Sequence, residues 1–141
     1  MGNLLSREQL LTKEKLEIIK VEFEDGNFVY VRQMTGHERD TFEQSLLRKT
    51  QDSKGKVNYE QATEDFRAKL SVCTVCDENG ELILQSGDYP KLSRSMSAKK
   101  LETIINKASE INKISEEDKE GIIKNSVADP VNNSSSGSVV N

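Results

Sequence analysis

Hydrophobic and polar positions change their period several times along the chain, and each change predicts a different element. In the clearest stretch the period is two. Val21 and Phe23 alternate with charged residues, and Val29 and Val31 continue the alternation beyond Asp25-Gly26-Asn27. Alternation is typical of half-buried strands, and Asp, Gly and Asn favour tight turns because they tolerate positive φ. The pattern therefore predicts a β-hairpin.

A helical period follows this hairpin, because Phe42 and Leu46 stand four residues apart. Thr35 and Glu38 precede them at the spacing of a capping box, in which each side chain bonds the backbone N–H of the other residue. We expect a helix over about residues 36–48, with the polar residues 48–58 forming a loop behind it.

A second apolar face predicts a longer helix, at spacings of three, four, four and three residues. Its members are Tyr59, Ala62, Phe66, Leu70 and Cys73. The β-branched run at 72–76 is expected to leave this helix as a strand and to turn at 77–80. Residues 81–85 are a possible partner strand, which would make a second, short hairpin.

The two ends of the chain carry further helix signals. Ser6 and Gln9 match a capping box for a short helix over about residues 7–12. Ser97 is expected to cap a long helix whose apolar stripe is either core or a partner surface, with core as the default. The stripe comprises Leu101, Ile104, Ile105, Ala108 and Ile111. A last short helix is expected to begin at Ser115 and end near Asn125.

These elements predict an α+β fold, a mainly helical single domain over residues 1–125. It contains the N-terminal β-hairpin and the possible second short hairpin. Residues 126–141 are rich in Ser and Asn and have no periodicity, so we expect a disordered C-terminal tail.

Composition narrows the class of function. Only 34% of the 141 residues are hydrophobic, so the core must be small, and a partner could contribute to stability. The net charge of −4 argues against general binding of nucleic acid, which needs clustered bases. The basic run at 91–100 is interpreted as a solvated loop and helix start. No apolar run is long enough to span a membrane, and we expect a cytoplasmic location.

Two features could carry chemistry. His37, the single histidine, could act as a general base, but no motif places a nucleophile beside it. Cys73 and Cys76 form one CxxC without the second ligand pair of a zinc site, and they follow a helix where a thioredoxin-type motif would open one. We interpret them as reduced core residues, or else as half of a site completed by a dimer. We expect no catalytic residue, cofactor or metal.

The order of these segments resembles the tail assembly chaperones of long-tailed bacteriophages and prophages. The most specific element is a strand ending in Arg, followed by Thr-Gly-x-Glu-Arg-Asp-x-Phe-Glu. A helix running into the Asp-Glu-x-Gly turn at 77–80 and the "ISEED" segment at 114–118 accompany it. The signature residues are Thr35, Gly36, Glu38, Arg39, Asp40, Phe42 and Glu43. The cysteine pair and the long connection at 48–58 depart from the family pattern.

The resemblance implies a non-enzymatic protein of the bacterial host cytoplasm that is not expected in the mature virion. Such chaperones bind the long, largely helical tape measure protein and keep it soluble while tube protein assembles around it. In many members a ribosomal frameshift appends a domain that recruits the tail tube protein. Apolar helical stripes suit helix-in-groove or helix-on-helix packing. The candidate partner-binding residues are therefore Phe42, Leu46, Leu101, Ile104 and Ile105. The oligomeric state is left open.

Two other classes of function remain as alternatives. The chain could be a permanent virion component, such as a head–tail connector or a tail terminator, since those are also small α+β proteins. A thiol-dependent enzyme acting through Cys73 and Cys76 is the other alternative.

Overall fold

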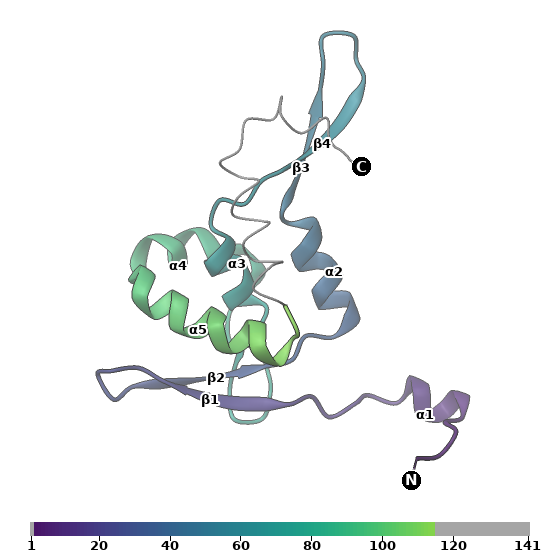
Figure 1. The fold of residues 1–141 in the computed structure, drawn as a ribbon, viewed down its shortest axis with the longest axis vertical. Coiled ribbons are helices and arrows are strands. Elements are labelled where there is room, and N and C mark those ends of the chain that lie inside the picture. The colour runs from purple at the N-terminus through teal and green to yellow at the C-terminus, as the bar shows by residue number, and fades with distance from the viewer. Residues whose placement is uncertain (1, 115–141) are drawn as a thin grey trace, which may run out of the picture.

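The computed structural model describes residues 2–114, which form the predicted α+β fold. Figure 1 shows α3, α4 and α5 on one side of strands β1 and β2, with the β3–β4 hairpin extending away from the helices. The elements are α1 (Arg7–Leu11), β1 (Ile18–Glu22), β2 (Phe28–Arg32), α2 (Gly36–Gln44), β3 (Leu47–Gln51), β4 (Val57–Gln61), α3 (Phe66–Val72), β5 (Val75–Cys76), a 3-10 turn (Ser86–Asp88), α4 (Tyr89–Ser95) and α5 (Ala98–Ile111).

The predicted N-terminal hairpin is confirmed and forms two strands of a three-stranded antiparallel sheet in the order β1-β2-β5. Val21 pairs with Val29, and Ile19 pairs with Val31. These side chains share the face toward the helices, where Val21 and Val31 are fully buried. In the turn, Asn27 N–H donates to the Asp25 carboxylate at 2.9 Å, so the short Asp side chain fixes the reversal.

Helix α5 covers this sheet face and supplies the largest part of the core. Ser97 caps it as predicted, accepting the Lys100 N–H at 3.1 Å. Its apolar stripe is buried, which confirms the core interpretation. Lys100 also donates to Asp25 at 2.7 Å, and Lys99 pairs with Glu24, so the start of α5 is held at the β1–β2 turn.

The other end of α5 is fixed by Asn112. Its side-chain oxygen accepts the Met34 N–H at 2.7 Å, and its amide donates to the Ala108 carbonyl at 2.9 Å. Its backbone carbonyl accepts from Arg39 Nη1 at 2.9 Å. One residue therefore connects the end of α5 to the junction between β2 and α2.

The region after Phe42 differs from the sequence prediction. Helix α2 ends at Gln44, and the expected loop at 48–58 is instead the β3–β4 hairpin. Asp52 closes its turn by accepting the Lys54 and Lys56 N–H groups at 2.9 and 2.8 Å. The polar composition of this segment led to the prediction of a loop. The segment nevertheless contains a turn with the same Asp-x-x-Gly spacing as the turn at 77–80.

The helix predicted to begin at Tyr59 was also too long. Tyr59 lies in β4, and α3 begins only at Phe66, after Asp65 adopts a left-handed backbone with φ 60°. Within α3 the prediction holds, since Phe66 and Leu70 are buried. The chain changes from strand to helix between Tyr59 and Phe66, two residues that sequence spacing had assigned to one helical face.

The second hairpin is shorter than expected. Strand β5 pairs with β2, through Tyr30–Cys76 and Val31–Val75, while residues 81–85 contribute a single bridge between Leu82 and Cys76. Part of the basic run at 91–100 is helical, because α4 spans Tyr89–Ser95.

The predicted helix at 115–125 and the predicted tail at 126–141 lie outside the described residues. Within residues 2–114, no helix is both long enough and apolar enough to cross a membrane.

Candidate functional site

Three residues form a hydrogen-bonded, charged group at the junction of β2 and α2. We call this group of Arg32, Thr35 and Glu38 the clasp. Arg32 Nη1 and Nη2 donate to the two carboxylate oxygens of Glu38 at 3.0 and 2.7 Å. The same Glu38 carboxylate accepts the Thr35 N–H at 2.9 Å, and the Thr35 hydroxyl accepts the Glu38 N–H at 3.1 Å. The capping box is therefore confirmed, and its Glu also neutralises an arginine whose side chain is only 8% exposed.

The ionisation of Glu38 follows from these contacts. Burial alone would raise the pKa of Glu38, because it disfavours the charged form. The hydrogen bonds from Arg32 and from the Thr35 N–H outweigh burial, so the pKa of Glu38 lies below its ordinary value. The carboxylate therefore stays charged at neutral pH and serves as a fixed counter-ion.

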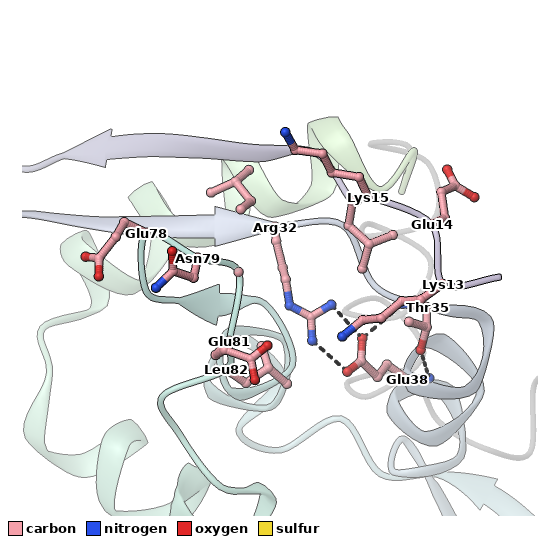
Figure 2. A pocket seen from close by; sticks show the side chains of 13 residues that line it. Lys13, Glu14, Lys15, Arg32, Thr35, Glu38, Glu78, Asn79, Glu81 and Leu82 are labelled. Atoms are coloured by element: carbon pink, nitrogen blue, oxygen red, sulfur yellow. Dashed lines mark hydrogen bonds and ion pairs between the residues drawn. The ribbon is translucent and has the colours of Figure 1, made fainter.

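A cavity of about 770 Å³ opens beside this clasp (Figure 2). Its walls are formed by residues 13–16, which precede β1, and by residues 78–82, which follow β5. Figure 2 shows Arg32 and Glu38 pointing toward each other, with Lys13 close by. The charged lining side chains besides the clasp are Lys13, Glu14, Lys15, Glu78 and Glu81. Their signs nearly balance, and the lining residues within 2–114 include no Ser, Cys or His, so this part of the cavity offers polar contacts around an already neutralised arginine.

The remaining signature residues are structural contacts of α2. Arg39 pairs with Glu43 at 3.1 Å and also reaches Asn112, while Asp40 is exposed. Phe42 is buried against Phe66, with ring centroids 5.8 Å apart. Thr35 and Gly36 form the exposed start of the helix. The segment thus combines a helix cap, an ion pair and a core anchor.

The structure buries the five candidate partner-binding residues in the core, which corrects the partner surface expected from helical spacing. All are at most 6% exposed: Phe42, Leu46, Leu101, Ile104 and Ile105. The reason is that α5 packs its whole stripe against the sheet and α3, which leaves no apolar face of α5 for a partner.

The residues considered for chemistry are also located. His37 is exposed in the first turn of α2 and does not line the cavity. Cys73 is half-buried and Cys76 is buried, and both are free thiols. Burial raises the pKa of both thiols, and the nearby Glu38 carboxylate adds to this for Cys73. Within the part of the chain that the structure describes, no three His, Cys, Asp or Glu side chains are grouped to hold a metal ion.

Exposed apolar side chains gather on two elements that contain none of the predicted partner-binding residues. Helix α1 has no buried residue, and Leu4, Leu5, Leu10 and Leu11 around it are 53–99% exposed. The β3–β4 hairpin exposes Leu47, Val57 and Tyr59. The available signal was the two leucine pairs on either side of the Ser6 cap, Leu4–Leu5 and Leu10–Leu11.

Comparison with protein-family models, with curated proteins and with solved structures found no match. Function is therefore inferred from the residues and from their arrangement. The most distinctive part of that arrangement is the exposed leucine arm, which we define as residues 4–11.

Proposed function

We propose that this chain is a non-enzymatic tail assembly chaperone of a long-tailed phage or prophage. It binds the tape measure protein in the bacterial cytoplasm and keeps that protein soluble while tube protein assembles around it. The order of the signature segments supports this assignment, and so does the use of the Thr35–Glu43 signature as a structural junction. A frameshifted extension that recruits the tail tube protein belongs to the same proposal.

The leucine arm is the observation that carries the proposal. Isolated exposed apolar residues are normal on a soluble protein, but a contiguous group usually marks an interaction site. Here four leucines lie within eight residues, and none is needed by the core of the domain. Figure 1 shows α1 at the end of an extended segment, away from the helices that form the body.

The chemistry of the arm fits a helical, apolar-striped partner. A tape measure protein presents long amphipathic helices, which associate with other apolar helical faces by side-chain packing. The Ser6–Gln9 capping box fixes the start of α1, so its leucines are presented on a formed helical turn. The balanced charges of the arm, Arg7 and Glu8, avoid repulsion from a partner of either sign.

The test is coexpression with the tape measure protein of the same phage. We expect the wild-type chain to hold that protein in the soluble fraction, and the Leu10→Glu, Leu11→Glu double variant to lose this effect. Ile83→Glu is the matched control, because Ile83 is also exposed, at 58% against 67% and 69% for Leu10 and Leu11, but lies outside the arm. Retention of full activity by the arm variant would overturn the role of the arm.

Analysis of purified particles separates chaperone from virion component. We expect mass spectrometry to find tube and tape measure proteins but not this chain. Its presence at the copy number of a tail ring would favour the alternative, a connector or terminator.

A further inference from the structure

One face of the β3–β4 hairpin, which we call its apolar face, exposes Leu47, Val57 and Tyr59 to solvent beside one lysine and two glutamines. Residues directly opposite each other in an antiparallel pair share a face. The pairs Leu47–Gln61, Lys49–Tyr59 and Gln51–Val57 therefore lie together, and all six side chains are exposed. The ion pair between Arg48 and Glu60 lies on the opposite face. Since two-stranded hairpins are marginal in water without further strands, this hairpin lacks the packing that would normally stabilise it.

Among residues 2–114 the β3–β4 sheet has only two strands, so both of its edges present backbone groups without a strand partner. The Asp52 N–H bonds the Lys56 carbonyl at 3.0 Å, and the Ala62 N–H bonds the Leu46 carbonyl at 2.7 Å. Because hydrogen-bonded and non-hydrogen-bonded pairs alternate, the odd-numbered residues direct their N–H and C=O groups outward. They are Leu47, Lys49 and Gln51 on β3, and Val57, Tyr59 and Gln61 on β4.

The two edges differ in charge. The outward residues of β4 are all uncharged, whereas β3 carries Lys49 in the middle of its edge. Applying the same alternation to the hairpin of β1 and β2, where Phe23 N–H bonds the Asn27 carbonyl, gives Lys20 and Glu22 as outward residues of β1. Charged side chains, Lys above all, are the usual protection of a free edge. Among these three strands, β4 alone has no lysine, and its one charged residue, Glu60, is paired with Arg48 of β3.

We propose that β4 pairs antiparallel with β4 of a second copy of this chain, about a two-fold axis at Tyr59. The result is a continuous four-stranded sheet, β3-β4-β4-β3. Tyr59 then stands opposite the partner's Tyr59, and the Asn58 amide stands opposite the partner's Glu60, whose carboxylate accepts hydrogen bonds. The apolar faces of both hairpins merge into one surface.

The charges that would face each other across the new strand pair support a second copy as the partner and β4 as the strand that pairs. Fully overlapped self-pairing of β1 would place Lys20 opposite the partner's Lys20, and that of β3 would place Lys49 opposite the partner's Lys49. Both arrangements oppose like charges, which destabilises a cross-strand pair. In β4 the central pair is aromatic, and aromatic cross-strand pairs are stabilising. The proposal concerns self-association and is independent of the proposed chaperone function.

The experiment is sedimentation equilibrium of the full chain and of charge variants at Tyr59. We expect a wild-type dimer, and an increase of about tenfold or more in the dimer dissociation constant for Tyr59→Lys, because two ammonium groups would meet at the axis. Gln51→Lys is the matched control. It adds the same charge to the same face on β3, and its dimer should persist. Since Tyr59 is 68% exposed, circular dichroism should show all variants folded.

A complementary pair tests the two-fold geometry. Tyr59→Lys and Tyr59→Glu should each dimerise at least about tenfold more weakly than wild type when alone, whereas their mixture should form a heterodimer, since opposite charges then meet across the axis. A wild-type chain that stays monomeric at about 100 µM overturns the proposal. So does a Tyr59→Lys dimer of unchanged affinity, which would place the contact elsewhere. A monomer that binds only a strand of another protein would likewise overturn self-pairing.

Discussion

Arg32 and Glu38 are joined by two hydrogen bonds, at 3.0 and 2.7 Å, where β2 ends and α2 begins. The carboxylate has a double role, because it also accepts the Thr35 N–H as part of the helix cap. Strand, cap and helix are therefore fixed relative to one another through one side chain.

Replacing Glu38 by Ala should destabilise the protein strongly. Removing one partner of a buried pair leaves an uncompensated charge, and here the Arg32 side chain is 8% exposed. We expect the free energy of unfolding to fall by about 3 kcal/mol in urea denaturation. The control is Glu110→Ala, which removes an exposed pair with Lys107 and should cost under about 0.5 kcal/mol. Equal losses in the two variants would contradict the role of the clasp.

The same carboxylate should make stability depend on pH. Its pKa is lowered in the folded chain, so the unfolded chain takes up this proton first as the pH falls. The contribution is complete above the ordinary value of 4.5 and is lost as the pH falls through the folded pKa. Between about pH 6 and 3, the free energy of unfolding should decline more steeply in wild type than in Glu38→Gln. Parallel curves would show that Glu38 has no such linkage.

Deleting residues 2–12 should leave the body intact. Helix α1 contributes no buried residue, and none of its leucines belongs to the core. We expect the free energy of unfolding to change by less than about 0.5 kcal/mol in chemical denaturation, as for other changes remote from packed groups. A loss well above this value would mean that the arm packs on the body in solution.

Substitutions in the α5 stripe should act on stability. Ile105→Ala should cost about 2–5 kcal/mol, because Ile105 is 2% exposed and its removal leaves a cavity. Leu101→Glu should unfold the domain, since it buries a carboxylate without a partner. Ile83→Ala is the exposed control and should cost little. Thermal unfolding monitored by circular dichroism would detect these differences, and a normally stable Leu101→Glu chain would contradict the burial of α5.

The two thiols should react slowly in the folded protein. Burial raises the pKa of Cys73 and Cys76, so the thiolate fraction at pH 8 is smaller than in free cysteine, and access is restricted. A colorimetric disulfide reagent should therefore label the native chain more slowly than the urea-unfolded chain, with Cys76 last. Labelling as fast as that of free cysteine would indicate an activated thiol instead.

Elements with a strong local signal were predictable from sequence. The β1–β2 hairpin combines strict alternation with a favourable turn, and α5 combines a cap with an unbroken apolar stripe. The capping box of Thr35 and Glu38 followed from spacing alone. In each case local preference and burial agree, which is why the pattern identified the element.

The errors arose where tertiary structure overrode spacing. Tyr59 fits the helical face of Phe66 and Leu70, yet β3–β4 pairing makes it part of a strand. The clasp was beyond sequence reasoning, because nothing in the spacing indicates that Arg32 turns back over the start of α2. The exposed leucine arm was missed because apolar spacing does not reveal whether the side chains find a core to enter.

The position of Asn112 has a consequence for whatever polypeptide follows Ile114. The side-chain oxygen of Asn112 accepts the Met34 N–H, and its backbone carbonyl accepts a hydrogen bond from Arg39. The point at which the chain leaves α5 is therefore anchored beside the first turn of α2. A domain attached downstream would therefore be joined to the body beside the β2–α2 junction. A pull on such an attachment would act first on the bonds that Asn112 makes with Met34 and Arg39.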